Sequence, residues 1–301
     1  MKTPKNQSGR DQHTPANSSR REFVAMSAAA AGLIAATGST RAAEPRILES
    51  DVLIRTADGV CDAAFLHPAH GSHAGVLIWP DIFGLRPVYR DFGKRLAAQG
   101  YSVLVPNLFY RSAKAPIYGD VSAISFQDPA IRAKMDQLTA PLNAPGAVEG
   151  DAQAFIAFLD AQPQVNKARK IGTQGYCMSG PLVMKSAATV PDRVGAGATF
   201  HGGGLVTDKS DSPHLLAPKI KARMYIAIAA SDDARQPDSK DKLREAFAAA
   251  NVTAEVEVYP GTQHGWCVPD MPARDGAPIY NRPEAERAWT KLLALYQATL
   301  T

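Results

Sequence analysis

Three scarcities limit what this sequence can encode. It has only 3 cysteines in 301 residues, Cys61, Cys177 and Cys267, which is too few for a disulfide scaffold. Their odd number in a chain that we expect to be exported indicates at least one thiol with another purpose. No Cys-x-x-Cys motif and no Cys/His spacing typical of zinc is present, so we expect neither a metal nor a cofactor. Low-complexity linkers and internal repeats are also missing, which favours a single domain.

The N-terminal region has no apolar run long enough to span a bilayer. Its apolar stretch, residues 25–36, falls short of the roughly 20 residues of a membrane-spanning helix, which argues against the alternative of a membrane anchor. Arg20 and Arg21 precede this stretch and small residues follow it, a layout that resembles the twin-arginine export signals of bacteria. We therefore expect residues 1–43 to be cleaved after transient contact with the export machinery, leaving a periplasmic or secreted protein without a stable membrane anchor.

Residues 44–301 also lack an excess of either acidic or basic residues. The formal net charge is +4, but the whole excess lies in residues 1–43, so residues 44–301 are formally neutral. Such a balance excludes nucleic acid as an expected partner. With 45% hydrophobic residues in the chain, residues 44–301 can bury one large core.

Short apolar runs alternate with amphipathic segments after residue 50. Strands are expected at residues 51–57, 60–68, 74–81, 101–106, 170–176, 194–203, 222–230 and 254–261. Helices are expected at residues 88–99, 148–159, 181–190 and 240–250, and from residue 283 onward. This alternation predicts an α/β fold with a mostly parallel central sheet and helices on both faces. In such sheets the functional residues lie beyond the carboxyl ends of the strands.

The segment GYCMSG, residues 175–180, places a cysteine where a buried strand turns into a helix. A nucleophile at this turn projects above the sheet, and the helix N-terminus favours a negative charge there. Gly175 and Gly180 suit a tight turn, while Ser179 occupies a position where the G-x-nucleophile-x-G pattern has glycine. Taken alone, Cys177 could equally be a small buried apolar residue.

Two further groups follow in the chain order of an α/β-hydrolase triad, which is nucleophile, acid and histidine. Asp232 and Asp233 come directly after one buried strand, and His264 lies on a loop after the next. A single histidine is more often structural, but all three residue types at strand ends favour catalysis. His201, in the segment FHGGG, follows the nucleophile instead of preceding it, so we interpret it as a strand end near the site and not as part of an oxyanion hole.

Five segments together resemble the dienelactone hydrolase family of α/β hydrolases, in the family's order and over roughly residues 50–300. They are WPDIFGL, LAAQGYSVLVPNLFYR, GYCMSG, DDARQP and YPGTQHGW. The resemblance implies the α/β-hydrolase fold and a carboxylic ester or lactone hydrolase of the carboxymethylenebutenolidase type. It also implies a Cys-His-Asp triad.

Carried over to this chain, the triad consists of Cys177 as nucleophile, His264 as base and Asp233 as the orienting acid. Asp233 is preferred because the family aspartate lies four residues before a proline, here Pro237. Asp232 stays open as an alternative.

Other family positions concern the substrate. Asp81 stands where the family commonly has a glutamate that holds the resting thiol, and Arg111 matches an arginine that binds a substrate carboxylate. The position of a second carboxylate-binding arginine is Val268 here. Trp266 is expected to line the pocket.

The predicted reaction is hydrolysis of a small-molecule ester or lactone through an acyl-enzyme on Cys177. Its oxyanion is expected between the backbone N–H groups of Ile82 and Met178, which follow the first buried strand and the nucleophile. Asp81 and Val268 motivate one alternative, a binding protein with an α/β-hydrolase fold and reduced catalysis. A redox-active thiol protein is the other.

Overall fold

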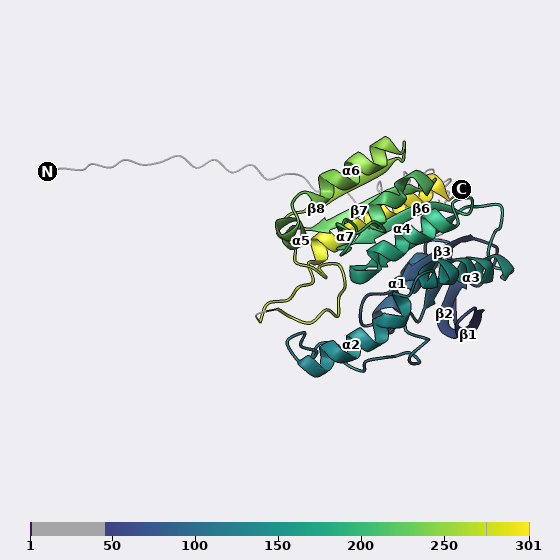
Figure 1. Cartoon of the computed structure of the whole chain (residues 1–301). Helices are drawn as coiled ribbons and strands as arrows, with labels where there is room; N and C mark the ends of the chain where they lie inside the picture. The colour runs from purple at the N-terminus through teal and green to yellow at the C-terminus, as the bar shows by residue number, and fades with distance from the viewer. Residues whose placement is uncertain (2–45, 275, 301) are drawn as a thin grey trace, which may run out of the picture. The chain divides into compact units, whose positions relative to one another are not determined.

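The computed structural model describes residue 1, residues 46–274 and residues 276–300 (Figure 1). Apart from its first residue, the predicted export signal of residues 1–43 lies outside the described residues. Within the part that is described, no helix combines the length and apolar character needed to cross a membrane.

Eight strands form one sheet in the order β1-β2-β4-β3-β5-β6-β7-β8. The first two pairings, β1 with β2 and β2 with β4, are antiparallel, and the remaining ones are parallel. The predicted mostly parallel sheet is therefore confirmed. The strands are β1 (Ile47–Thr56), β2 (Gly59–Pro68), β3 (Ala74–Trp79), β4 (Tyr101–Pro106), β5 (Ile171–Tyr176), β6 (Val194–Phe200), β7 (Arg223–Ala229) and β8 (Ala254–Tyr259).

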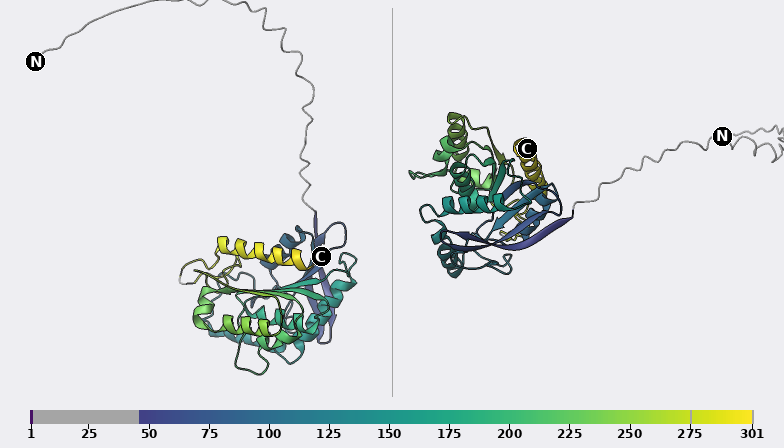
Figure 2. Two further views of the ribbon diagram at one scale, coloured as in Figure 1. Left: turned by 90° about the horizontal axis from the view of Figure 1, so that it is seen from above. Right: turned by 90° about the vertical axis from the view of Figure 1, so that its right-hand side faces the viewer.

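Helices cover both faces of the sheet, as Figure 2 shows for α6 and α7, which lie on opposite sides. Side chains of α1 and α7 pack into one buried apolar cluster, and those of α2, α3, α4 and α6 pack into the other. The helices are α1 (Pro87–Ala97), α2 (Pro129–Leu142), α3 (Ala147–Ala161), α4 (Gly180–Thr189), α5 (Ala230–Arg235), α6 (Ser239–Ala249) and α7 (Arg282–Thr299). Two short 3₁₀ segments complete them, η1 (Cys177–Ser179) and η2 (Pro213–Lys219).

Helix α2 is the longest element that sequence patterning missed, and the shorter α5 and η2 were not predicted either. Only Met135, Leu138 and Leu142 of its residues are buried, so its apolar stripe is narrow and the 3.6-residue period is weak. Its start does carry a signal, because the carboxylate of Asp128 accepts the N–H of Ala130 and Pro129 opens the first turn.

Candidate active site

The turn after β5 holds Cys177 in a strained backbone conformation. Its φ is +57°, in the left-handed region that residues other than glycine rarely adopt, at a cost of about 1–3 kcal/mol. The flanking glycines are required by packing. A Cβ on Gly175 would lie 2.6 Å from the carbonyl oxygen of Ser179, and one on Gly180 would lie 2.9 Å from the Cα of Gly202.

Ser179, where the motif departs from glycine, has a structural role. Its side chain is fully buried, and its hydroxyl donates a hydrogen bond to the carbonyl oxygen of Pro80. This bond joins the turn after β5 to the end of the neighbouring strand β3. These two segments carry Met178 and Ile82, the predicted oxyanion donors.

A continuous hydrogen-bonded relay joins three strand ends. His264 Nε2 lies 3.1 Å from Cys177 Sγ, and His264 Nδ1 lies 2.8 Å from Asp232 Oδ2. The loop that carries His264 is attached to the start of α5, because the N–H of His264 donates to Ser231 Oγ at 2.9 Å. The fold therefore brings together Cys177, His264 and one of the two candidate aspartates.

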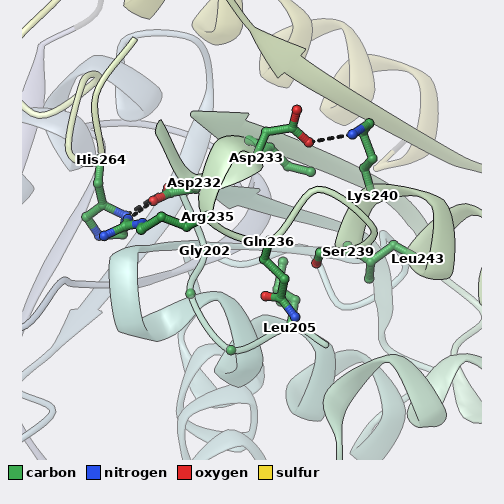
Figure 3. Close-up of a pocket in the computed structure, with 13 residues that line it drawn as sticks. Gly202, Leu205, Asp232, Asp233, Arg235, Gln236, Ser239, Lys240, Leu243 and His264 are labelled. Carbon is green, nitrogen blue, oxygen red and sulfur yellow. Dashed lines mark hydrogen bonds and ion pairs between the residues drawn. The ribbon is translucent and has the colours of Figure 1, made fainter. Parts of the chain in front are cut away.

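The expectation that Asp233 contacts His264 is wrong. Its carboxylate instead binds Lys240 Nζ at 2.7 Å, and Figure 3 shows the two aspartates directed to different partners. The reason is that both belong to α5, where successive side chains point about 100° apart. Only one of them can face His264, and that one is Asp232.

The surroundings of His264 favour its protonated form. Burial alone would lower the pKa of His264, but hydrogen bonds to Asp232 and to Cys177 outweigh this effect and raise the pKa to about 10. An imidazole with such a pKa holds a proton at neutral pH, so it can carry the proton of the neighbouring thiol.

A cavity of about 620 Å³ opens beside Cys177 and His264. Ile82 and Met178 border it next to the thiol, and segments 122–127 and 271–274 form its walls. A smaller cavity of about 220 Å³ borders Asp232 and His264 but not Cys177 (Figure 3). The larger cavity is therefore the one in which a substrate can reach the sulfur.

Ile82 and Met178, whose N–H groups are the predicted oxyanion donors, both border the larger cavity together with Cys177. The N–H groups on either side of Ile82 are used internally: that of Asp81 donates to Tyr89 Oη at 3.1 Å and that of Phe83 donates to Asp81 Oδ1 at 2.9 Å. Among the described residues, the N–H of Ile82 has no acceptor. Met178 follows Cys177 in η1, where the first N–H groups of a helical turn have no partner within the turn.

Asp81 does not hold the thiol. Its side chain is fully buried, and its two carboxylate oxygens bind the guanidinium of Arg86 at 2.6 and 3.0 Å. The shorter aspartate therefore does not take over the role of the family glutamate, and its expected place among the substrate-binding residues is wrong because it does not border the cavity. Arg86, five residues further on, is its partner and was not singled out from the sequence.

Arg111 and Trp266 are not found at the cavity either. Arg111 has only 9% of its side chain exposed and binds Asp58 at 2.6 Å and Asp151 at 2.8 Å, so its charge is already paired. Trp266 is fully buried and stacks on Tyr259 with ring centroids 4.5 Å apart. Both predicted contacts with substrate are wrong, because these side chains complete the protein's own packing.

The arginines that do line the cavity are Arg235 and Arg274. Arg235 also donates to Asp232 Oδ1. Arg235 belongs to the segment DDARQP but was not singled out from it, and Arg274 belongs to none of the five segments. Their place becomes visible only once α5 and the loop after β8 are brought to the same end of the sheet.

His201 is buried directly beside the relay, as its position at a strand end predicted. Its ring packs edge-on against His264 with centroids 4.9 Å apart, and its Nδ1 lies 3.4 Å from Cys267 Sγ. Burial, followed by the charge of His264, holds the pKa of His201 well below its usual range. His201 is therefore neutral and supports the His264 ring by packing.

An eight-stranded, mostly parallel sheet that carries a nucleophile turn, a carboxylate and a histidine at its strand ends defines an α/β hydrolase. Residues 61–300 match the dienelactone hydrolase family. The chain belongs to this family. The predicted class, a carboxylic ester or lactone hydrolase, is confirmed by that membership.

Similar proteins agree with this assignment. A protein of Methylorubrum extorquens that bears the provisional name carboxymethylenebutenolidase is 29% identical over 91% of each chain. One of Synechocystis with the same provisional name is 26% identical over 77% of this chain and 89% of its own. The crystal structure of a provisionally named dienelactone hydrolase from Klebsiella pneumoniae superposes with a TM-score of 0.68 at 23% identity, covering 84% of this chain and 99% of that one, which supports the fold.

Proposed function

We propose that this protein hydrolyses a small ester or lactone by covalent catalysis on Cys177. The observation that carries the proposal is the relay of 3.1 Å from sulfur to imidazole and 2.8 Å from imidazole to the carboxylate of Asp232. The provisional names of the relatives, carboxymethylenebutenolidase, support a lactone as one substrate class.

In the proposed reaction, His264 holds the proton of the Cys177 thiol, and the Cys177 thiolate attacks the carbonyl carbon. The N–H groups of Ile82 and Met178 stabilise the oxyanion that forms. His264 then donates its proton to the departing alkoxide, leaving a thioester on Cys177. A water molecule, deprotonated by His264, attacks this thioester and releases the carboxylic acid and the thiol.

The cavity favours a substrate with an anionic group beside an apolar part. Arg235 and Arg274 border it, while Phe126 and Ile279 contribute apolar side chains. Because Arg111 is paired with two aspartates and does not border the cavity, the binding of a substrate carboxylate falls to the two arginines that do, of which Arg235 also binds Asp232. We therefore propose that they replace Arg111 in this role.

The test is turnover of p-nitrophenyl acetate and of a carboxylated butenolide by the wild type, Cys177→Ala and His264→Ala. We expect both variants to lose at least about a hundredfold in kcat/KM, since nucleophile and base act in the same step. Unchanged turnover in either variant would disprove the proposed mechanism.

The same variants separate the two alternatives. A binding protein would bind the butenolide without turnover in the wild type. A redox thiol would form a sulfenic acid with peroxide, reversed by a thiol reductant, and would show no Cys177-dependent ester hydrolysis.

A further inference from the structure

Arg86 is a buried cation that joins two segments far apart in the chain. Its side chain is 3% exposed and binds Asp81, which is fully buried, and Asp270, which is 36% exposed. The contacts to Asp270 are 2.8 Å from Nε to Oδ2 and 2.8 Å from Nη2 to Oδ1. A guanidinium that binds two carboxylates in this way fixes their relative position, because both contacts involve two parallel bonds.

The first carboxylate sets the course of the chain around Ile82. Asp81 Oδ1 accepts both Arg86 Nη1 and the N–H of Phe83. Ile82 lies between Asp81 and Phe83, so the direction of its N–H depends on this bonded turn. Arg86 also donates to the carbonyl oxygen of Gly84 at 3.3 Å and lies over the ring of Phe83.

The second carboxylate belongs to the residue that precedes one wall of the cavity. Asp270 directly precedes the segment 271–274, which lines the cavity and includes Arg274. Arg86 itself is not among the residues that line the cavity. Its influence on a substrate must therefore pass through its two partners.

We propose that Arg86 is a positioning residue of the hydrolase, which orients the N–H of Ile82 through Asp81 and holds the cavity wall 271–274 through Asp270. This proposal rests on the function proposed above, and it assigns the two carboxylate contacts of Arg86 to different parts of the reaction. The Asp81 contact serves the transition state, in which the oxyanion exists, and the Asp270 contact serves substrate binding.

The first test compares Arg86→Lys and Arg86→Gln with the wild type. We expect kcat to fall about tenfold or more, because displacing one oxyanion donor weakens only the transition state. The affinity for an aryl trifluoromethyl ketone, which adds Cys177 reversibly and places its oxygen in the oxyanion hole, should fall by the same factor as kcat/KM. Alkylation of Cys177 by iodoacetamide needs no oxyanion hole, so its rate should stay within about twofold of the wild type.

Arg90→Lys is the matched control. Arg90 lies on α1, of which Arg86 is the N-cap residue, and it also binds two carboxylates, those of Glu49 and Asp51, but it is 28% exposed and does not border the cavity. Its kinetics should stay within about twofold of the wild type.

Asp270→Asn tests the second contact in a partly exposed position that tolerates the change. We expect KM to rise about fivefold with kcat nearly unchanged, since uniform substrate binding is weakened. Folding of each variant is checked by circular dichroism, and if the Arg86 variants do not fold, Asp270→Asn decides on its own. An unchanged KM in Asp270→Asn, or a loss of turnover in Arg86→Lys without loss of ketone affinity, overturns the proposal. If the proposed function is wrong, the wild type itself will show no turnover. If only the role of Arg86 is wrong, the wild type will turn over substrate and the variants will not behave as expected.

Discussion

At the residue scale, the identity of the acid depends on a single step along a helix. Asp232 and Asp233 are adjacent in the sequence and have the same side chain, yet one binds His264 and the other binds Lys240. The family's spacing to Pro237 favoured the wrong one because spacing along the chain does not record the rotation of α5. The order nucleophile, acid, histidine was predictable, whereas the choice between the neighbours required the direction of each side chain.

Asp232→Asn and Asp233→Asn should therefore differ sharply. Loss of the Asp232 carboxylate removes the group that orients His264 and stabilises its charge, so kcat/KM should fall by about 10²–10⁴. Loss of the Asp233 carboxylate breaks a partly exposed ion pair with Lys240, and kcat/KM should stay within about twofold. Hydrolysis of p-nitrophenyl acetate measures both, and equal losses would contradict the assignment.

The raised pKa of His264 gives a pH dependence with a definite sign. The contribution of the Asp232–His264 pair to stability is fully present below the ordinary pKa of histidine, about 6.5, and is lost as the pH rises through about 10. The destabilisation caused by Asp232→Asn should therefore be larger at pH 6.5 than at pH 10. Urea unfolding at the two pH values measures it, and histidine NMR should show the pKa of His264 falling in the same variant.

At the scale of elements, the strands of the sheet could be predicted from the sequence, whereas the segments that form the cavity walls could not. Apolar runs predicted β3 and β4, and a run interrupted by glycines predicted β5. All three strands are buried along their whole length. The cavity walls, 122–127 and 271–274, have no periodic pattern, and their place follows from contacts such as that between Arg86 and Asp270. The predicted substrate residues Arg111 and Trp266 failed for this reason: a motif records a residue type but not what has already paired with it.

Arg274, in the loop between β8 and α7, gives a prediction at this scale. Its side chain borders the cavity, and in the proposed function its charge binds a substrate carboxylate. Arg274→Ala should raise KM about tenfold for a carboxylated butenolide and leave p-nitrophenyl acetate nearly unchanged, because only the former is anionic. Steady-state kinetics on both substrates check this, and an equal effect on the two would argue against an anion-binding role.

At the scale of the whole molecule, composition and the alternation of strands and helices were sufficient to predict an α/β fold. Residues 46–274 and 276–300 contain the sheet, both helical layers and all three members of the relay. The one large omission, α2, buries too few side chains for its pattern to be visible. The fold class depends on a pattern shared by many residues, so wrong predictions for single residues at the cavity do not change it.

We propose that the folded domain acts outside the cytoplasm after export through the twin-arginine route. Expressed at full length in a bacterial host, the protein should appear in the periplasm with an N-terminus near residue 44. Arg20→Lys combined with Arg21→Lys should retain it in the cytoplasm, since this pair is the feature on which the signal depends. Cell fractionation and N-terminal sequencing check the outcome. Unprocessed protein in the periplasm, or unchanged export of the double variant, would contradict it.

In the proposed function Cys177 is required for catalysis, yet its left-handed backbone lowers the stability of the fold at the same position. A glycine there would relieve the backbone strain, although it would also raise the conformational entropy of the unfolded chain. It would also remove the sulfur atom. A descendant of this protein freed from its chemical task could therefore drift toward relaxed residues at this turn while the surrounding fold persists.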